Sequence, residues 1–204
     1  MRFARRILRG FAGALAGLAI MTTWPLSHAD SQATDLIAQA RQALDAGRPD
    51  DAMAYLEKAV TADPKNPSAL AWLGSAQVQK ARAVPIFDRP GWVKKGFNTL
   101  DEAVERFPDA SVVYVMRGIT AAQVPDMFKK APLAVTDLGT VLAMREKNSQ
   151  LVPDSDMPAV YLHLGIAYKK NGQIAEARAT WEKGKNAYPS APQASAMEKE
   201  LRGL

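Results

Sequence analysis

Residues Pro158 to Pro189, PAVYLHLGIAYKKNGQIAEARATWEKGKNAYP, decide the fold of this chain. Apolar and small residues recur at helical spacing in two runs, Tyr161–Tyr168 and Ala177–Gly184. The dipeptide Asn171-Gly172 interrupts the pattern between them, as a helix C-cap followed by a short turn does. We therefore predict two antiparallel helices of nearly equal length joined by a tight turn.

This order of residues resembles the tetratricopeptide repeat (TPR), a helical hairpin of about 34 residues with the pattern W-x2-L-G-x2-Y…A-x3-F…P. The matching positions are Tyr161, Leu164, Gly165, Tyr168, Ala177, Trp181 and Pro189, with Gly184 where the family usually has alanine. Hairpins of this family stack into a solenoid in which each repeat contacts its neighbours. The resemblance therefore implies an all-α fold.

Three further hairpins and a final helix are expected in the same chain. The repeats are predicted over residues 33–66, 67–108, 111–145 and 158–191, and a capping helix over 193–202. The residues at the signature glycine position, Ala40, Gly74, Gly118 and Gly165, lie 34, 44 and 47 residues apart. The predicted architecture of residues 30–204 is thus a right-handed α-solenoid of about four TPR helix-turn-helix repeats with a C-terminal capping helix.

The longer spacings predict insertions in the second and third repeats. In the second repeat we expect a loop over residues 81–92 and a helix from about Val93 to Phe107. In the third we expect a loop over 124–132 and a longer polar surface loop over 146–157. In the first repeat, Asp50 or Asp51 is expected to cap the second helix.

The first 29 residues have the composition of a signal peptide. Met1 to Gly10 carries four arginines and no acid, Phe11 to Leu26 is apolar or small, and Ser27-His28-Ala29 offers small residues to a signal peptidase. We expect export by the Sec route, cleavage after Ala29 and a location in a bacterial periplasm. The alternative is an uncleaved segment that anchors the chain in the inner membrane.

Charge and cysteine content limit the partners and the chemistry. The whole chain carries +5, and the part after Ala29 carries +1 because the leader holds four arginines and no acid. A near-neutral chain lacks the basic footprint of a nucleic-acid-binding protein, so no nucleic-acid partner is expected. The chain has no cysteine, which excludes disulfides and thiol chemistry.

No arrangement of residues in the sequence is typical of an enzyme. After cleavage His163 is the only histidine, and Ala167 stands where a second helical ligand would be needed. There is no nucleophile elbow and no glycine-rich phosphate loop. Capping and solubility explain acid pairs such as Asp101-Glu102. We therefore predict no enzymatic activity and no catalytic, metal or cofactor site.

The resemblance to the family implies a concave groove, lined by the first helix of each repeat, that holds a peptide. The positions carried over onto this chain are Ile37, Arg41, Leu44, Ala71, Ser75, Val78, Val115, Ile119, Ala122, Leu162, Ile166, Lys169 and Lys170. They would form a mostly apolar surface with a positive rim, suited to a partner segment with a few acids. The alternative is that the inserted loops or the capping helix fill the groove.

The inserted loops offer a second, weaker candidate surface. Val84-Pro85-Ile86-Phe87 and Val124-Pro125-Asp126-Met127-Phe128 follow the first helices of consecutive repeats, and basic residues follow each. Phe87, Trp92 and Phe128 either pack against neighbouring repeats or form an aromatic and basic contact surface along one edge.

Together these observations predict a non-catalytic periplasmic adaptor or assembly factor that binds a peptide or a partner protein. One alternative is a membrane-tethered subunit of an inner-membrane or envelope complex. A second is an accessory subunit of a periplasmic enzyme or of a cytochrome-maturation system.

Overall fold

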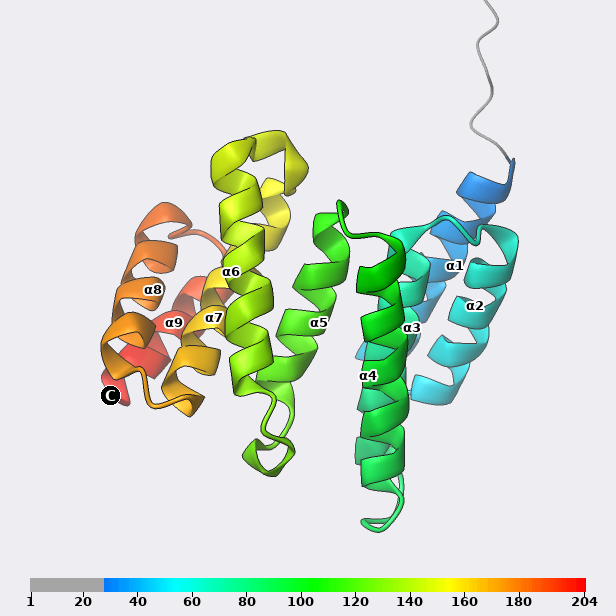
Figure 1. Cartoon of the computed structure of the whole chain (residues 1–204), viewed down its shortest axis with the longest axis horizontal. Helices are drawn as coiled ribbons and strands as arrows, with labels where there is room; N and C mark the ends of the chain where they lie inside the picture. Colours follow the sequence, from blue (N-terminus) through cyan, green and yellow to red (C-terminus); the bar gives the residue numbers. More distant parts are fainter. Residues whose placement is uncertain (1–27) are drawn as a thin grey trace, which may run out of the picture.

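The computed structural model describes residues 28–204, which form nine α-helices and no strand (Figure 1). The expected signal peptide lies outside the described residues except for its last two, which begin α1. The helices are α1 (His28–Asp45), α2 (Pro49–Ala62), α3 (Pro67–Lys80), α4 (Arg89–Arg106), α5 (Ser111–Gln123), α6 (Ala131–Lys147), α7 (Met157–Lys170), α8 (Ile174–Ala187) and α9 (Pro192–Arg202).

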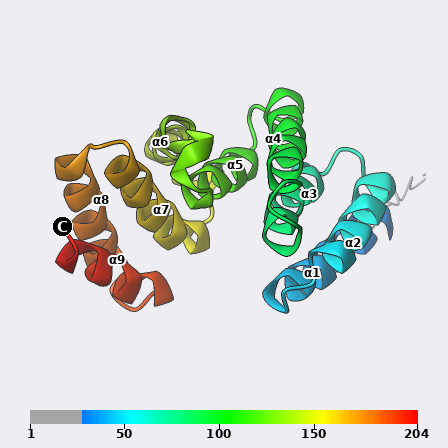
Figure 2. The same cartoon turned by 90° about the horizontal axis from the view of Figure 1, so that it is seen from below.

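The helices pack as four successive hairpins and a closing helix. α1 packs on α2, α3 on α4, α5 on α6 and α7 on α8, while α1, α3, α5 and α7 also contact one another in a row. Seen from below, the row bends into an arc with α1 and α9 at its two ends (Figure 2). The all-α solenoid predicted from the sequence is confirmed.

The signature glycines allow the two helices of a hairpin to approach closely. A Cβ atom built on Gly165 would lie 2.2 Å from Nε1 of Trp181, and one on Gly74 would lie 2.7 Å from Cγ of Leu100. Trp181 is fully buried, and its Nε1 donates a hydrogen bond to the Leu162 carbonyl at 2.9 Å. The indole therefore occupies the space that a side chain at Gly165 would need.

Helix α9 covers the end of the stack. Met197 is fully buried, and a Cβ atom at Gly184 would lie 2.7 Å from its sulfur. Lys169 of α7 also pairs with Glu200 of α9 at 3.0 Å. An apolar contact and an ion pair thus hold the capping helix against the last hairpin.

The inserted connection of the second repeat is shorter than predicted. Helix α4 begins at Arg89, not near Val93, so Trp92 lies on a helix and the connection contracts to a 3₁₀ turn over Ala81–Ala83 and residues 84–88. Pro90 falls in the first turn of α4, where a missing N–H costs no hydrogen bond. Pro132 lies in the first turn of α6 in the same way, although we expected the loop to reach this residue.

Two smaller predictions about the connections were also wrong. The segment over 146–157 is not a plain polar loop: α6 runs to Lys147, two 3₁₀ turns follow, and Val152 and Met157 are buried. Neither Asp50 nor Asp51 caps α2, because Pro49 takes the first helical position and both acids lie within the first turn. Asp51 instead pairs with Arg48 at 2.8 Å.

Among helices α1 to α9, none combines the length and the apolar character that a transmembrane helix requires.

Candidate functional site

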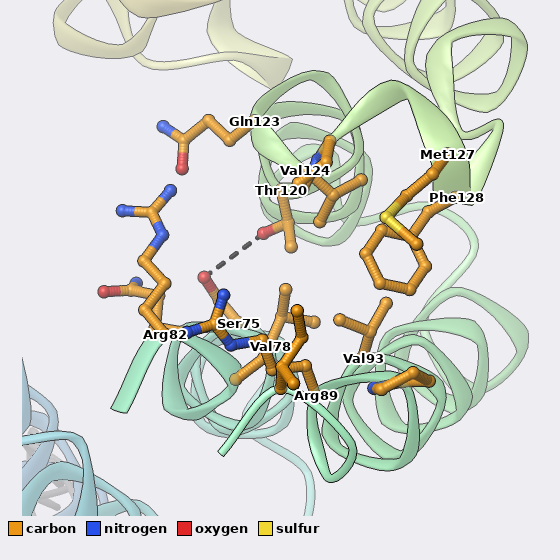
Figure 3. Close-up of a pocket in the computed structure, with 15 residues that line it drawn as sticks. Ser75, Val78, Arg82, Arg89, Val93, Thr120, Gln123, Val124, Met127 and Phe128 are labelled. Atoms are coloured by element: carbon orange, nitrogen blue, oxygen red, sulfur yellow. Dashed lines mark hydrogen bonds between the residues drawn. The ribbon is translucent and has the colours of Figure 1, made fainter. Parts of the chain in front are cut away.

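An apolar cleft opens where both inserted connections emerge from the solenoid. The α3–α4 and α5–α6 connections lie along the same edge of the stack, at the bottom of Figure 1. Between them is a cavity of about 270 Å³ (Figure 3). We call it the loop-edge cleft; it is lined by Ser75, Val78, Gln79, Ala81, Arg82, Ile86, Arg89, Pro90, Val93, Thr120, Gln123, Val124, Pro125, Met127 and Phe128.

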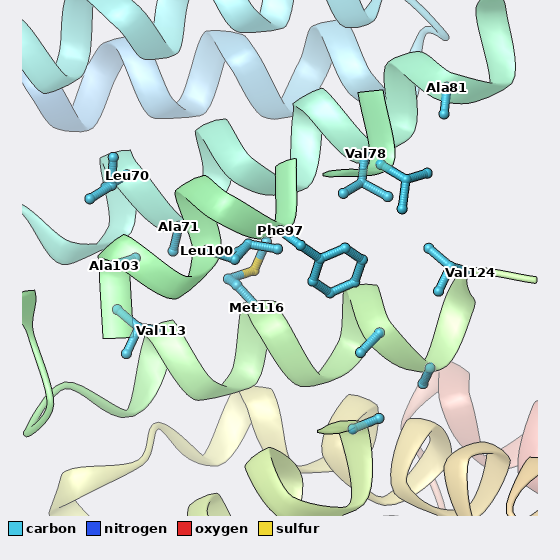
Figure 4. Close-up of a cluster of buried hydrophobic side chains, with 14 of the residues drawn as sticks. Leu70, Ala71, Val78, Ala81, Phe97, Leu100, Ala103, Val113, Met116 and Val124 are labelled. Carbon is cyan, nitrogen blue, oxygen red and sulfur yellow. The ribbon is translucent and has the colours of Figure 1, made fainter. Parts of the chain in front are cut away.

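The floor of the cleft is part of the core. Val78 and Val124, which line the cleft, are buried in the same cluster as Phe97 of α4, and this cluster joins α3, α4 and α5 (Figure 4). Ser75 and Thr120 are nearly fully buried, and the Thr120 hydroxyl donates to Ser75 Oγ at 3.2 Å. Because helix packing holds this floor, the cleft has a defined shape without a bound partner.

The rim of the cleft exposes large apolar side chains. Ile86 is 66% exposed, Phe87 93% and Met127 78%. Ile86 and Met127 line the cleft directly, and Phe87 follows Ile86 in the same connection. Exposed apolar side chains that gather in one place mark interaction surfaces more often than single ones do.

Contacts to neighbouring helices hold both connections in place. Lys170 of α7 donates to the Val124 carbonyl at 2.8 Å and pairs with Asp126 at 3.2 Å. Arg89 Nε donates to the Val84 carbonyl at 3.3 Å. The exposed side chains of the rim are therefore carried by backbone that is itself hydrogen-bonded.

Several of the predicted groove residues are more deeply buried than expected. Ala71 and Ala122 are fully buried and Val115 nearly so, because the first helices of neighbouring repeats pack closely against each other. A partner therefore has no access to these three side chains. Ser75 and Val78 are the predicted groove residues that line the loop-edge cleft.

The other predicted groove residues lie along α1, α5 and α7. Ile37, Leu44, Ile119, Leu162 and Ile166 are half-buried and pack against core clusters.

The predicted positive rim is engaged in contacts within the chain. Arg41 is exposed and lies over the Trp72 ring, 5.3 Å from its centroid. Lys169 pairs with Glu200, and Lys170 holds the α5–α6 connection.

The three aromatic residues predicted for the loops behave differently from one another. Trp92 is half-buried on α4, with Lys95 Nζ 5.0 Å from its ring centroid. Phe128 is half-buried and packs against the central core cluster. Phe87 projects into solvent. Two of the three thus pack against neighbouring repeats, and one remains available for contact.

Sequence reasoning missed an ion-pair cluster that joins α4, α5 and α6. Asp137 of α6 accepts two hydrogen bonds of 2.8 Å from Arg117 of α5, which also donates to Asp101 of α4 at 2.8 Å. Burial raises the pKa of Asp137, opposed by the Arg117 guanidinium, and the hydrogen bonds to Asp137 raise the pKa of Arg117. The sequence held one sign of this cluster: Asp137 lies three residues after Ala134 and four before Val141, at helical spacing on the face of α6 that is buried.

His163 lies close to the cleft in a mostly apolar setting. Its Nδ1 atom is buried and has no hydrogen-bond partner among the described residues, and its Nε2 atom is 3.5 Å from the Gln123 amide nitrogen. Burial lowers the pKa of His163 to about 4. Residues 28–204 contain no group of three or more histidine, aspartate and glutamate side chains that could hold a metal ion.

Comparisons with known proteins agree with this architecture. Models of the tetratricopeptide repeat match residues 43–84 and 159–191. A comparison with curated protein sequences found no match. The crystal structure of a thermophilic TPR protein from Thermus thermophilus is similar with a TM-score of 0.51 and 19% identity, covering 84% of this chain and 100% of that one. At this identity the likeness shows the fold alone, whereas the two sequence matches identify residues 43–84 and 159–191 as tetratricopeptide repeats; together they support a tetratricopeptide repeat protein.

Proposed function

We propose that this protein is an exported, non-catalytic adaptor that binds a partner protein through the loop-edge cleft. Tandem TPR units indicate a protein–protein interaction scaffold. The observation that carries the proposal is the exposure of Ile86, Phe87 and Met127 around a preformed apolar cleft.

The energetics of the rim support a binding role. Burying a large apolar side chain is worth about 1.5–3 kcal/mol, and the fold leaves three such side chains in solvent on its two inserted connections. The connections are also held in place by Lys170 and Arg89. Because less chain freedom is lost when an ordered surface binds, this arrangement favours association.

The proposal places the binding surface at one edge of the solenoid and not along the groove that the sequence suggested. Ala71, Val115 and Ala122 are buried, so a partner in the groove could not contact their side chains. The loop-edge cleft, in contrast, is a cavity bordered by exposed apolar side chains. Ile119 and Ile166 stay half-buried on the first helices, so they serve as the comparison positions in the test.

Site-specific photo-cross-linking in cells that produce the protein tests this assignment. We would replace Phe87 or Met127 with p-benzoylphenylalanine, and would replace Ile174 of α8, which is 44% exposed, as a matched control. We expect a covalent adduct with the same partner protein from positions 87 and 127 and none from 174. Adducts from Ile119 and Ile166, with none from 87 and 127, would place the partner in the groove and overturn the proposal.

Export is the second part of the proposal, and the arginine-rich, apolar first 29 residues support it. Cell fractionation followed by N-terminal sequencing tests it. We expect a periplasmic protein whose first residue is Asp30. A membrane-bound protein that retains residues 1–29 would instead support the tethered subunit, and a cytoplasmic protein would contradict export.

A further inference from the structure

We infer that the loop-edge cleft recognises a peptide segment of its partner in which an aspartate or glutamate lies close in sequence to an apolar side chain. This inference rests on the proposed function and specifies the chemistry of the partner. It depends on the division of the cleft into an apolar and a cationic side.

The apolar side of the cleft would hold the apolar side chain of the partner segment. Val78, Val93, Val124, Met127 and Phe128 enclose this part of the cleft. The volume of about 270 Å³ falls just below the roughly 300–1,000 Å³ typical of pockets for small molecules. The cleft therefore suits an inserted side chain better than a whole cofactor or metabolite.

The opposite side of the cleft is polar. Figure 3 shows Arg82 and Gln123 across the cleft from Met127 and Phe128, with the hydroxyls of Ser75 and Thr120 between the two sides. An extended segment that places an apolar side chain against Phe128 therefore passes next to hydrogen-bond donors on the other side.

The positive charge of the cleft indicates that the partner segment carries a carboxylate. Arg82 and Arg89 line it, and no carboxylate is among its lining residues in the part of the chain that the structure describes. Neither arginine belongs to an ion pair within residues 28–204; the same holds for Arg41 and Arg178, whereas the other five arginines of this range are paired. Arginine binds carboxylates through paired N–H donors, so the missing counter-charge is expected from the partner.

A second copy of this chain is the main competing occupant. Its Phe87-Asp88 would offer an aromatic ring beside a carboxylate. A contact confined to two short connections, however, is small beside the roughly 1,200–2,000 Å² that stable interfaces bury. A two-fold contact would also bring Arg82 and Arg89 of both copies together. These two points favour a different protein as the partner.

Selection from a phage-displayed library of random peptides against the purified protein provides the probes. We expect the enriched peptides to share an aspartate or glutamate near a leucine, isoleucine, methionine or phenylalanine. One such peptide, synthesised with a fluorophore, would then be titrated by fluorescence anisotropy. We expect the paired substitution Arg82→Glu and Arg89→Glu to weaken binding at least tenfold, and Arg178→Glu on exposed α8 to change it less than twofold.

A charge exchange makes the test specific. The same peptide with lysine in place of its acid should bind the Arg82→Glu/Arg89→Glu protein more tightly than it binds the original protein. A variant that was merely misfolded would bind neither peptide.

The remaining outcomes separate this inference from the proposed function. The selected peptides could be apolar, lack an acid, and lose binding to the Ile86→Asp/Met127→Asp protein but not to the Arg82→Glu/Arg89→Glu protein. This result would overturn the inference and leave the proposed adaptor surface intact. Peptides that bind the Ile86→Asp/Met127→Asp protein unchanged would overturn both. A dimer in sedimentation experiments that Phe87→Asp abolishes would assign the cleft to a second copy. A selection that enriches no peptide would show that no linear segment is recognised.

Discussion

Arg117 donates two hydrogen bonds of 2.8 Å to the carboxylate of Asp137, a residue that is only 1% exposed. A third nitrogen of the same guanidinium reaches Asp101 of α4 at 2.8 Å. One side chain thus connects α4, α5 and α6, three of the four helices that border the two inserted connections. The cluster thus ties the second repeat, through α4, to both helices of the third.

Removing one partner of this pair should destabilise the fold strongly. Asp137→Ala leaves the Arg117 guanidinium buried without its main partner, and such losses cost about 3–5 kcal/mol of the free energy of unfolding. Urea denaturation followed by circular dichroism measures the change. Asp101→Ala, whose side chain is half exposed, should cost less than about 1 kcal/mol.

The double variant Arg117→Met with Asp137→Leu provides the control, because apolar residues of similar volume often replace a buried pair with little loss. We expect it to be more stable than Asp137→Ala. Equal stability of Asp137→Ala and the original protein would show that the cluster does not hold the repeats together.

Sequence periodicity reveals packing between apolar residues better than it reveals such a cluster. Gly165 and Trp181 were both recognised because each lies at a fixed position of the repeat, and the structure brings them into contact. Arg117 and Asp137 come from different helices, and their pairing depends on how those helices are oriented. A single sequence contains no direct signal of that orientation.

The contact between Gly165 and Trp181 predicts a position where alanine is not tolerated. In Gly165→Ala the new Cβ would lie 2.2 Å from Nε1 of Trp181, so the indole must shift away from its hydrogen bond to Leu162. Overpacking of this kind costs about 1–3 kcal/mol. The expected result is a lower midpoint in thermal unfolding.

Gly139→Ala is the matched control, since Gly139 is also helical and a Cβ there meets nothing within 4 Å. Alanine is favoured over glycine in helices by roughly 1 kcal/mol, so this variant should be as stable as the original protein or more stable. The same destabilisation in both variants would argue against a role for the indole.

His163 should make the fold sensitive to mild acid. Its pKa is about 4 in the folded protein and 6.5 in its ordinary state, and burial is the cause. Between these pH values the unfolded chain binds a proton that the folded protein does not, so the free energy of unfolding decreases as the pH falls from 6.5 towards 4. At about 1.4 kcal/mol per pKa unit, the loss amounts to roughly 3 kcal/mol.

Urea denaturation at pH 7.5, 6, 5 and 4 measures this effect. His163→Met keeps an apolar body and removes the titrating group, so its stability should decrease less between pH 6.5 and 4. Carboxylates titrate in both proteins, and the difference between the two curves therefore isolates His163. Parallel curves would show that the histidine is protonated without cost.

The loop-edge cleft could be predicted only in part. Two expanded connections at equivalent places in consecutive repeats were visible in the sequence, and both emerge along one edge of the solenoid. Their lengths were overestimated because Pro90 and Pro132 lie within the first turns of helices and not in the loops before them. Arg82 and Arg89 were not identified as a pair, since only the course of the α3–α4 connection places both on the cleft.

Lys170 should control the order of the α5–α6 connection without contributing much to global stability. Its amine donates to the Val124 carbonyl and pairs with Asp126, the residue before the exposed Met127. In Lys170→Met both contacts are lost, and exposed ion pairs of this kind contribute less than about 1 kcal/mol. We expect faster hydrogen exchange at the amides of Phe128 and Lys129, whose hydrogen bonds close this turn.

Hydrogen exchange followed by mass spectrometry measures this in peptides that cover residues 124–130. Lys169→Met is the matched control, because Lys169 pairs with Glu200 on α9 and should alter exchange there and not in the connection. If ordering of the connection assists partner binding, Lys170→Met should also reduce photo-cross-linking from position 127. Faster exchange with undiminished cross-linking would show that the partner binds the apolar rim equally well when Lys170 does not order the α5–α6 connection.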